Sequence, residues 1–176
     1  MFFGLLLDTA AANRVELFRK QFLYKNHLEE KPIKADRLHV SLHHIGDYER
    51  LRSKFIYAAR QAGQAVSMRP FATTFRFIAS FEGAPAVGGR RKRPLVLLGE
   101  SDALLEFHKT LGAAMRKCGL PAAESFTPHM TLSYGQTPIS LQAIAPIRCS
   151  FSEFVLIHSE VGLGHYNMVD RWSSGG

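Results

Sequence analysis

The sequence contains the stretch His39-Val40-Ser41-Leu42, and the same pattern returns as His129-Met130-Thr131-Leu132. Each copy consists of a histidine, an apolar residue, a hydroxyl residue and a leucine. On a β-strand, side chains two residues apart share a face and adjacent side chains point to opposite faces. Each histidine therefore shares a face with the hydroxyl that follows it, while the two apolar residues point to the core. The repeat predicts two matched strands in corresponding halves of one fold.

The sequence around the first motif predicts alternating strands and helices. The apolar run 2–7 is typical of a buried strand, and the spacing of apolar residues predicts a helix over about 9–24, capped by Asp8 or Thr9. The first motif then lies in a predicted strand over 38–45. A second helix is predicted to open at Gly46-Asp47 and to stop at Gly63.

The second half repeats this order of elements. One or two strands are predicted over 68–81, and a short buried strand over 95–98. A helix capped by Ser101 or Asp102 is expected to end near Gly119, before a strand over 129–134 that carries the second motif. The tail contains two further strand-like runs, 151–158 and 164–172. A strand, a helix and a strand thus lead to each motif, which indicates two similar lobes.

Length and charge restrict the class of protein. A chain of 176 residues suits a single bilobal domain over residues 1–176, and its formal charge of +7 favours polyanionic partners such as RNA. The densest basic cluster, Arg90 to Arg93, is expected on a mobile loop, where it either is simply solvated or grips RNA. Cys118 and Cys149 show no disulfide spacing, which predicts reduced thiols in a cytoplasmic protein. No run approaches the ~20 apolar residues of a membrane span, so we expect no membrane partner.

The paired motifs suit chemistry at phosphorus. If the two lobes face each other, His39 and His129 lie on opposite walls of a cleft with Ser41 and Thr131 beside them. An in-line displacement needs a base at the attacking oxygen and an acid at the leaving oxygen, and two imidazoles with a pKa near 6.5 can supply both. The hydroxyls would bind the non-bridging phosphate oxygens. This chemistry requires no metal and no cofactor, and a 2′,3′-cyclic phosphate is an attractive substrate.

The other histidines have structural explanations. His43 shares the predicted strand face of His39, which would suit a metal site, but no third ligand is evident. His108 is expected to be a packed, hydrogen-bonded side chain of the third helix, and His158 is expected to face solvent. Phe126 is a candidate for stacking on a nucleobase, but packing in the core is the favoured interpretation.

The segment 31–42, followed by Ile45-Gly46, resembles the first motif region of the RNA 2′,3′-cyclic phosphodiesterases, also called 2′-5′ RNA ligases, of the two-histidine phosphoesterase superfamily. The segment 126–132 is similar to their second motif region. The resemblance extends to the first strand and helix, to 93–99 and to 154–172, and so covers nearly the whole chain.

This resemblance implies an α+β, bilobal fold, in which two pseudo-symmetric lobes of mainly antiparallel sheet with outer helices surround a central cleft. It also implies hydrolysis of a 2′,3′-cyclic phosphate to a 2′-phosphate, with reversible 2′-5′ ligation in some members. In that family the second histidine is usually the base and the first the acid, so His129 and His39 would take those roles, which the sequence by itself leaves open. Tyr134 stands where an arginine is common, and it should point away from the face of His129 unless the strand bulges.

Two alternatives remain open at the level of sequence. One is a non-catalytic RNA-binding module that uses the same cleft and basic surface. The other is a phosphodiesterase that acts on another cyclic phosphate or on a 2′-5′ linkage. The oligomeric state is also open, with a monomer favoured.

Overall fold

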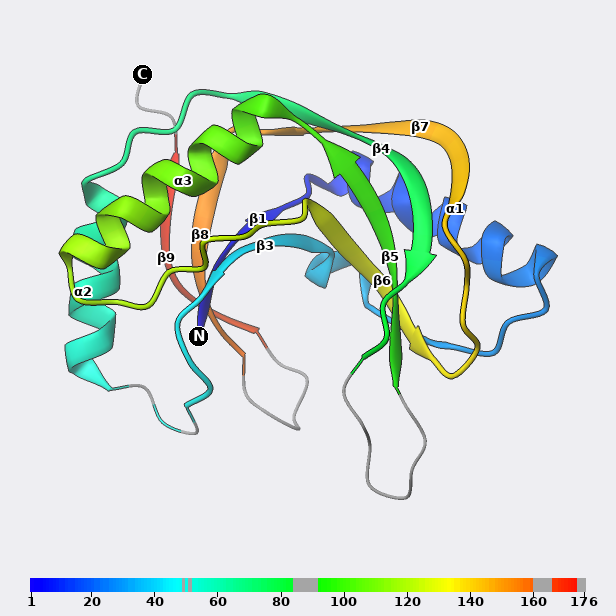
Figure 1. Ribbon diagram of the computed structural model, residues 1–176, viewed down its shortest axis with the longest axis horizontal. Helices are drawn as coiled ribbons and strands as arrows, with labels where there is room; N and C mark the ends of the chain where they lie inside the picture. The colour runs from blue at the N-terminus through cyan, green and yellow to red at the C-terminus, as the bar shows by residue number, and fades with distance from the viewer. Residues whose placement is uncertain (49, 51, 84–91, 160–165, 174–176) are drawn as a thin grey trace.

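The computed structural model describes residues 1–48, 50, 52–83, 92–159 and 166–173. The first half of the chain forms β1 (Phe2–Leu6), α1 (Thr9–Lys25), β2 (Lys31–Pro32), the 3₁₀ turn η1 (Ala35–Arg37), β3 (His39–His44) and α2 (Ser53–Gln64). The second half forms β4 (Phe71–Ser80), β5 (Arg93–Glu100), α3 (Asp102–Lys117), β6 (His129–Gly135), β7 (Gln142–Phe151), β8 (Glu153–Ser159) and β9 (Tyr166–Ser173) (Figure 1).

The described strands form one nine-stranded sheet in the order β7-β4-β5-β6-β3-β1-β8-β9, with β2 paired to β6. The pairs are antiparallel throughout the described residues. The two motif strands, β3 and β6, are neighbours at the middle of this order. Four strands of this order lie in each half, β2 adds a fifth to the half that contains β6, and the halves meet at the motifs. This arrangement confirms the predicted mixed α+β class with a mainly antiparallel sheet.

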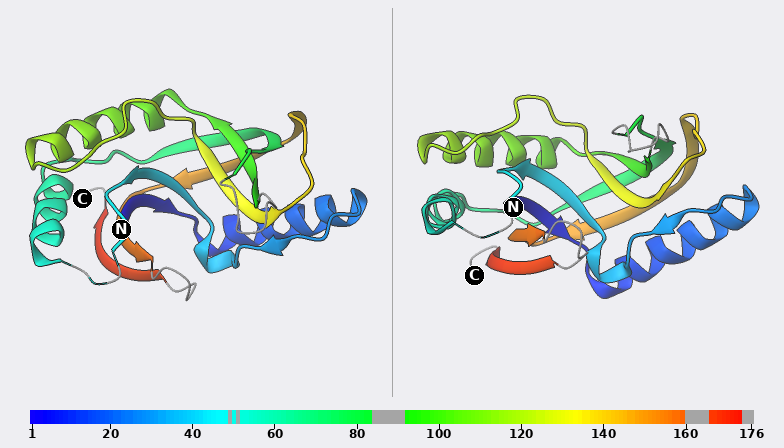
Figure 2. Two further views of the ribbon diagram at one scale, coloured as in Figure 1. Left: turned by 60° about the horizontal axis from the view of Figure 1, so that its bottom comes forward. Right: turned by 90° about the horizontal axis from the view of Figure 1, so that it is seen from below.

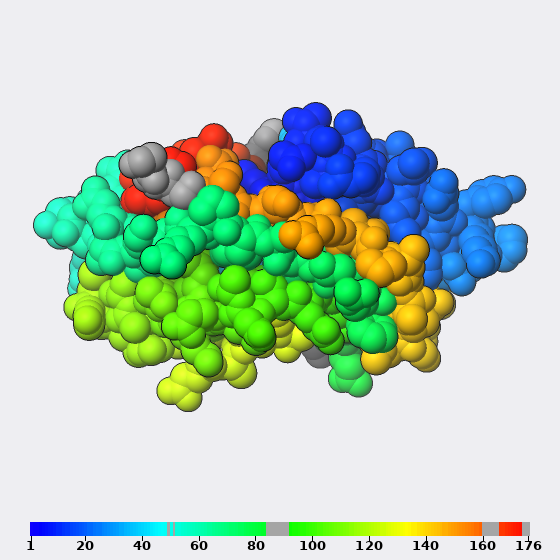
Figure 3. All heavy atoms as spheres, turned by 90° about the horizontal axis from the view of Figure 1, so that it is seen from above, coloured from blue at the N-terminus to red at the C-terminus, as the bar shows by residue number. Residues whose placement is uncertain are grey.

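The helices lie on the outside of the sheet, at opposite ends of the molecule (Figure 2). Helix α1 contacts β7, and the Arg14 guanidinium donates to the Arg148 carbonyl oxygen at 3.3 Å. In the view from above, α1 and β7 lie side by side on the surface (Figure 3). Helix α3 packs against β3 and β4, with the ring of Phe107 5.1 Å from that of Phe154 in β8. Helix α1 therefore covers the half of the sheet that contains β6. Helix α3 packs against strands of both halves.

Local sequence explains most helix ends. The Asp8 carboxylate accepts from the Ala11 amide at 2.7 Å, and the Ser101 hydroxyl accepts from the Leu104 amide at 3.2 Å. Each such cap is typically worth about 1 kcal/mol because it satisfies a free amide of the first turn. The expected caps and the strand-helix-strand order before each motif, β1-α1-β3 and β5-α3-β6, are confirmed.

The prediction for the second helix was wrong at its start and correct to within one residue at its end. Helix α2 begins at Ser53, not at Gly46-Asp47, and it ends at Gln64, one residue beyond Gly63. A Cβ atom at Gly63 would lie 2.4 Å from the indole of Trp172 in β9. Because Gly63 has no side chain, α2 can approach β9 closely. This packing role was not visible in the sequence.

Strand β7 was missed, and β2 was not expected as a strand. Both contain a proline, Pro146 in β7 and Pro32 in β2. A proline lacks the amide that a central strand needs, so it argues against a strand in the sequence. Strand β7 forms one edge of the sheet, where a missing donor is tolerated.

Candidate active site

The two motifs lie next to each other on one face of the sheet. Strands β3 and β6 are antiparallel with Val40 paired to Met130, so the register sets His39 opposite Thr131 and Ser41 opposite His129. The four histidine and hydroxyl residues are partly exposed, whereas the apolar residues of both motifs are buried. We call this side of the sheet the motif face. The alternation predicted from the sequence is therefore present in both strands.

Each motif strand has an irregularity at the leucine of its motif. In β3, Ser41 pairs with Gly4 and His43 pairs with Phe3, which leaves Leu42 without a partner in β1. In β6, Thr131 pairs with Val96 and Ser133 with Leu95, which leaves Leu132 as the extra residue. An extra residue of this kind is a β-bulge, and it reverses the alternation of side chains beyond it. Both motif strands therefore have a bulge at the leucine of the motif.

The first bulge corrects the predicted position of His43. Its side chain is 1% exposed and lies on the core side, so it does not share the face of His39. The His43 ring stacks on that of His108 at 3.8 Å, and the His108 ring stacks on that of Phe126 at 4.1 Å. Phe126 is thus packed against the core, as the alternative held, and is not free to stack on a base.

The hydrogen bonds of these buried histidines define their charge state. His43 Nε2 lies 2.9 Å from the His108 carbonyl oxygen, to which it donates, while Nδ1 accepts from the Ala123 amide at 3.3 Å. His43 is therefore neutral. His108 is packed as expected, but its Nε2 is buried without a partner among the described residues. Burial lowers the pKa of His108 to about 4, and the adjacent His43 ring acts in the same direction when it is protonated.

The second bulge places Tyr134 on the motif face. The sequence allowed this orientation only if the strand bulged, and it does so at Leu132. Burial raises the pKa of the Tyr134 phenol, with a contribution from Tyr166 across the motif face. Arg37 acts in the opposite direction. Tyr134 thus remains a neutral hydroxyl within electrostatic range of residues from the other half of the sheet.

The ring of His39 is fixed on several sides. Its Nδ1 is 2.8 Å from the Arg37 carbonyl oxygen, and its Nε2 is 3.0 Å from the Ser41 hydroxyl. The rings of Phe2 and Tyr166 lie 5.0 and 5.5 Å from the His39 ring. Burial by these neighbours lowers the pKa of His39 to about 4, and the nearby charges of His129 and Arg37 act in the same direction.

The ring of His129 is anchored in the same way but is less enclosed. Its Nδ1 is 2.7 Å from the Thr127 carbonyl oxygen, and the ring of Phe81 lies 5.1 Å away. In both histidines, Nδ1 faces the carbonyl of the residue two positions earlier. A carbonyl only accepts, so Nδ1 must carry the proton and donate. In the neutral rings, Nε2 then holds the free electron pair.

Other predictions for individual residues have mixed outcomes. His158 is buried at 4% exposure and bonds the Tyr48 carbonyl oxygen through Nε2 at 2.8 Å, so the expectation that it faces solvent was wrong. Residues 84–91, which include Arg90 and Arg91 of the basic cluster, lie outside the described residues. Cys118 and Cys149 are free thiols. Within the described part of the chain, no group of three or more His, Cys, Asp or Glu side chains is arranged to hold a metal ion.

Comparison with known proteins places the chain in a family. The profile of the 2′-5′ RNA ligase superfamily matches residues 7–163. The structure is similar to that of E. coli LigT in apo form, with a TM-score of 0.71 and 20% identity over 98% of this chain and 95% of that chain. It is also similar to TT0787 of Thermus thermophilus, with a TM-score of 0.71 and 18% identity over 98% and 96% of the two chains.

A more distant likeness is to the MHV ns2 PDE domain, with a TM-score of 0.51 and 20% identity over 84% of this chain and 96% of that chain. No curated protein matches the chain. At these identities the structures establish a shared fold, whereas the family profile covers most of the sequence. The protein is a member of the 2′-5′ RNA ligase superfamily of phosphoesterases and ligases.

Proposed function

We propose that this protein hydrolyses 2′,3′-cyclic phosphates of RNA ends or nucleotides to 2′-phosphates without a metal ion. The observation that supports this most is the matched pair of histidines, His39 and His129, presented with Ser41 and Thr131 on one face of the sheet. Two imidazoles and two hydroxyls supply an acid, a base and donors for the phosphate oxygens. If the 5′-hydroxyl of a second RNA attacks the cyclic phosphorus in place of water, the same bond to the 3′ oxygen breaks and a 2′-5′ linkage forms.

The proposed reaction uses the Nε2 atoms of both rings. His129 Nε2 takes a proton from water as the water oxygen attacks phosphorus. The bond from phosphorus to the ribose 3′ oxygen breaks, and His39 Nε2 gives that oxygen a proton. The proton on each Nδ1 stays on its ring and is held by its backbone carbonyl, which fixes ring orientation through the reaction.

The low pKa of His39 bears on its role as the acid. With a pKa of about 4, the ring is neutral in the free protein near pH 7. A phosphodiester anion bound beside the ring favours the protonated form, because an opposite charge within a few ångströms raises the pKa of an imidazole. Substrate binding would therefore charge the acid where it is needed. LigT, a relative in fold, has been solved with phosphate and with 3′-AMP, which is consistent with a phosphate site in this fold.

The remaining predictions belong to the same proposal. RNA is the partner that suits both the +7 charge and the superfamily. Among the described residues, none of the helices is long and apolar enough to cross a membrane. The single bilobal domain over 1–176, the monomeric state and the cytoplasmic location stay predictions.

The test is turnover of an RNA that ends in a 2′,3′-cyclic phosphate, followed by phosphorus NMR in the presence of EDTA. We expect only the 2′-phosphate as product, and none from the His39→Ala/His129→Ala double variant. His44→Ala is a matched control, because His44 lies in the same strand but is exposed and bonded to Asp47. Activity that EDTA abolishes, or that survives in the double variant, would refute the mechanism. Salt-sensitive RNA binding without turnover would favour the non-catalytic alternative.

A further inference from the structure

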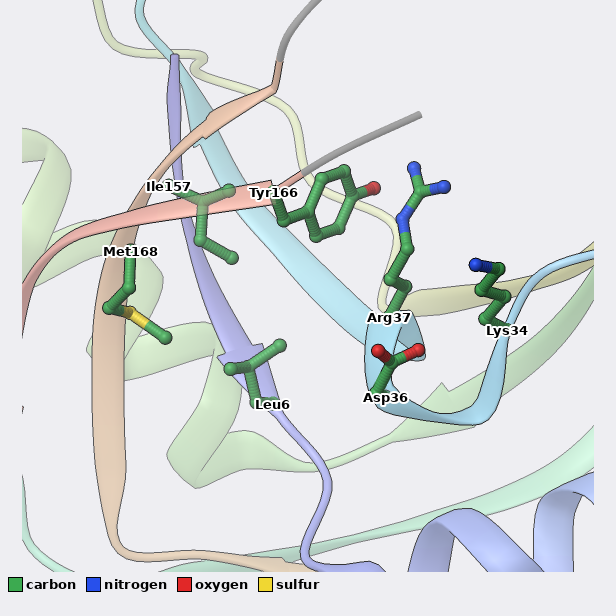
Figure 4. A pocket seen from close by; sticks show the side chains of 7 residues that line it. All are labelled: Leu6, Lys34, Asp36, Arg37, Ile157, Tyr166 and Met168. Carbon is green, nitrogen blue, oxygen red and sulfur yellow. The ribbon is translucent and has the colours of Figure 1, made fainter. Parts of the chain in front are cut away.

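Figure 4 shows a pocket of about 200 Å³. It lies near His39, because Leu6 is the strand partner of His39 and the Tyr166 ring contacts the His39 ring. Its apolar floor is formed by Leu6 of β1, Ile157 of β8 and Met168 of β9. Ile157 is the strand partner of Met168. Met168 is 44% exposed, so part of this floor is open to solvent. Ile157 and Leu6 belong to a small hydrophobic cluster that is separate from the main core.

One wall of the pocket is the aromatic ring of Tyr166. The Tyr166 ring meets the His39 ring edge to face, and the Arg37 guanidinium carbon lies 4.1 Å from the centre of the Tyr166 ring. This stacking of cation on ring holds Tyr166 in place. Lys34 and Asp36 complete the lining and offer one donor and one acceptor group at the rim (Figure 4).

We propose that this pocket binds the nucleobase of the nucleotide that carries the cyclic phosphate, an inference that rests on the proposed function. Its volume is below the roughly 300–1,000 Å³ of pockets for drug-sized ligands and suits one planar ring system. An apolar floor and an aromatic wall match the faces of a base, while the polar rim matches its edges.

The position of the pocket also gives the substrate a direction. The leaving oxygen belongs to the ribose, so the ribose and its base must lie on the side of the acid. The pocket adjoins His39 and not His129, which sets the nucleoside beside His39 and leaves the His129 side for water. The placement agrees with His39 as the acid and His129 as the base.

The experiment compares 2′,3′-cyclic AMP with the 2,3-cyclic phosphate of methyl riboside, which has the same reacting centre and no base. We expect kcat/KM of the wild-type protein to be at least about tenfold higher for the nucleotide, since stacking of a base on an aromatic side chain is worth about 1–3 kcal/mol. The Met168→Glu substitution should bring this ratio close to one. Leu17→Glu is the matched control, because Leu17 is 58% exposed on α1 and does not line the pocket, and it should keep the wild-type ratio.

Binding gives a second readout that does not depend on turnover. Calorimetry should show that 2′-AMP binds the wild-type protein at least about tenfold more tightly than methyl riboside 2-phosphate, with the preference lost in Met168→Glu. Equal kcat/KM for the two cyclic phosphates would overturn the base pocket and leave the proposed reaction intact. Absence of turnover with both would overturn the reaction, and equal binding of the two monophosphates would then overturn the pocket as well.

Discussion

Strands β3 and β6 carry the same four-residue motif and the same bulge, yet their histidines have different surroundings. His39 is enclosed by two aromatic rings and bonded to Ser41, whereas His129 has one aromatic neighbour among the described residues, Phe81. The repeated backbone presents one imidazole and one hydroxyl from each half of the sheet. In the proposed mechanism the two imidazoles do opposite things with a proton, and the difference in their surroundings fits those two roles. The proposal therefore uses both the symmetry of the chain and the asymmetry of the environment.

Removal of either imidazole should have the largest effect on activity and tests this comparison most directly. His39→Ala and His129→Ala should each lower kcat/KM by about 10²- to 10⁴-fold, the usual contribution of an acid or base. The double variant should lose little more than the worse single variant, because the two groups act as one unit. His44→Ala should stay within about threefold of wild type. Steady-state kinetics on a 2′,3′-cyclic nucleotide would measure all four, and a loss below tenfold in either single variant would contradict the pairing.

The two hydroxyls provide a smaller test. Ser41→Ala and Thr131→Val should each lower kcat by about tenfold or more, since a hydrogen bond to a charged group is worth about 1.5–3 kcal/mol. Ser41 bonds a histidine in the free protein, so Ser41→Ala should also alter the pH profile, whereas Thr131→Val should not. Thr110→Val, on the outer helix α3, is the control. Equal pH profiles for both variants would argue against the asymmetry.

The pH profile should report the enclosure of His39 directly. The profile of kcat/KM reflects groups of the free protein, and the pair is inactive when both rings are protonated because no base remains. The pKa of His39 is lowered to about 4, so we expect the acidic limb of the profile near that pH rather than near 6.5. Below it, the rate should fall about tenfold per pH unit. Tyr166→Leu should move the limb upward, whereas Tyr57→Leu, an exposed change on α2, should not.

The smallest expected effect concerns stability and the buried histidine stack. The pKa of His108 is about 4 when folded and near 6.5 when unfolded, so the unfolded chain binds more protons in this range. Stability should therefore fall as the pH drops from about 6.5 towards 4. His108→Phe keeps a ring in the stack and removes one of the histidines with a lowered pKa, which should make the dependence of Tm on pH less steep. Exposed His27→Asn should leave it unchanged, and an unaltered slope in His108→Phe would contradict this account.

The sequence predicted the site better than it predicted the path of the chain beyond it. Alternation alone placed His39 with Ser41 and His129 with Thr131, because two residues of regular strand are enough for that inference. The bulges at Leu42 and Leu132 were not predicted, since neither position holds a glycine or proline that would signal one. As a result His43 was assigned to the wrong face, and the place of Tyr134 depended on the structure.

The wrong start of α2 and the unpredicted pocket have a similar origin. Arg52 caps α2 without a side-chain hydrogen bond, so no residue type marked the start of that helix. The pocket beside His39 joins Leu6, Arg37, Ile157, Tyr166 and Met168, which are brought together only by the pairing of β1, β3, β8 and β9. The motif face was visible in the sequence because it is local, and the pocket was not because it is assembled from distant strands.

The paired bulges also bear on how such a protein can change during evolution. Up to its leucine, each motif strand is constrained by both the chemistry and the core. Beyond the bulge, the constraints separate: His43 and Ser133 face the interior, while His44 and Tyr134 face outward from the motif strands. A substitution at position 134 can therefore change the motif face without repacking the interior or moving an imidazole. Position 134 is the natural target for a library that seeks new specificities on an unchanged frame.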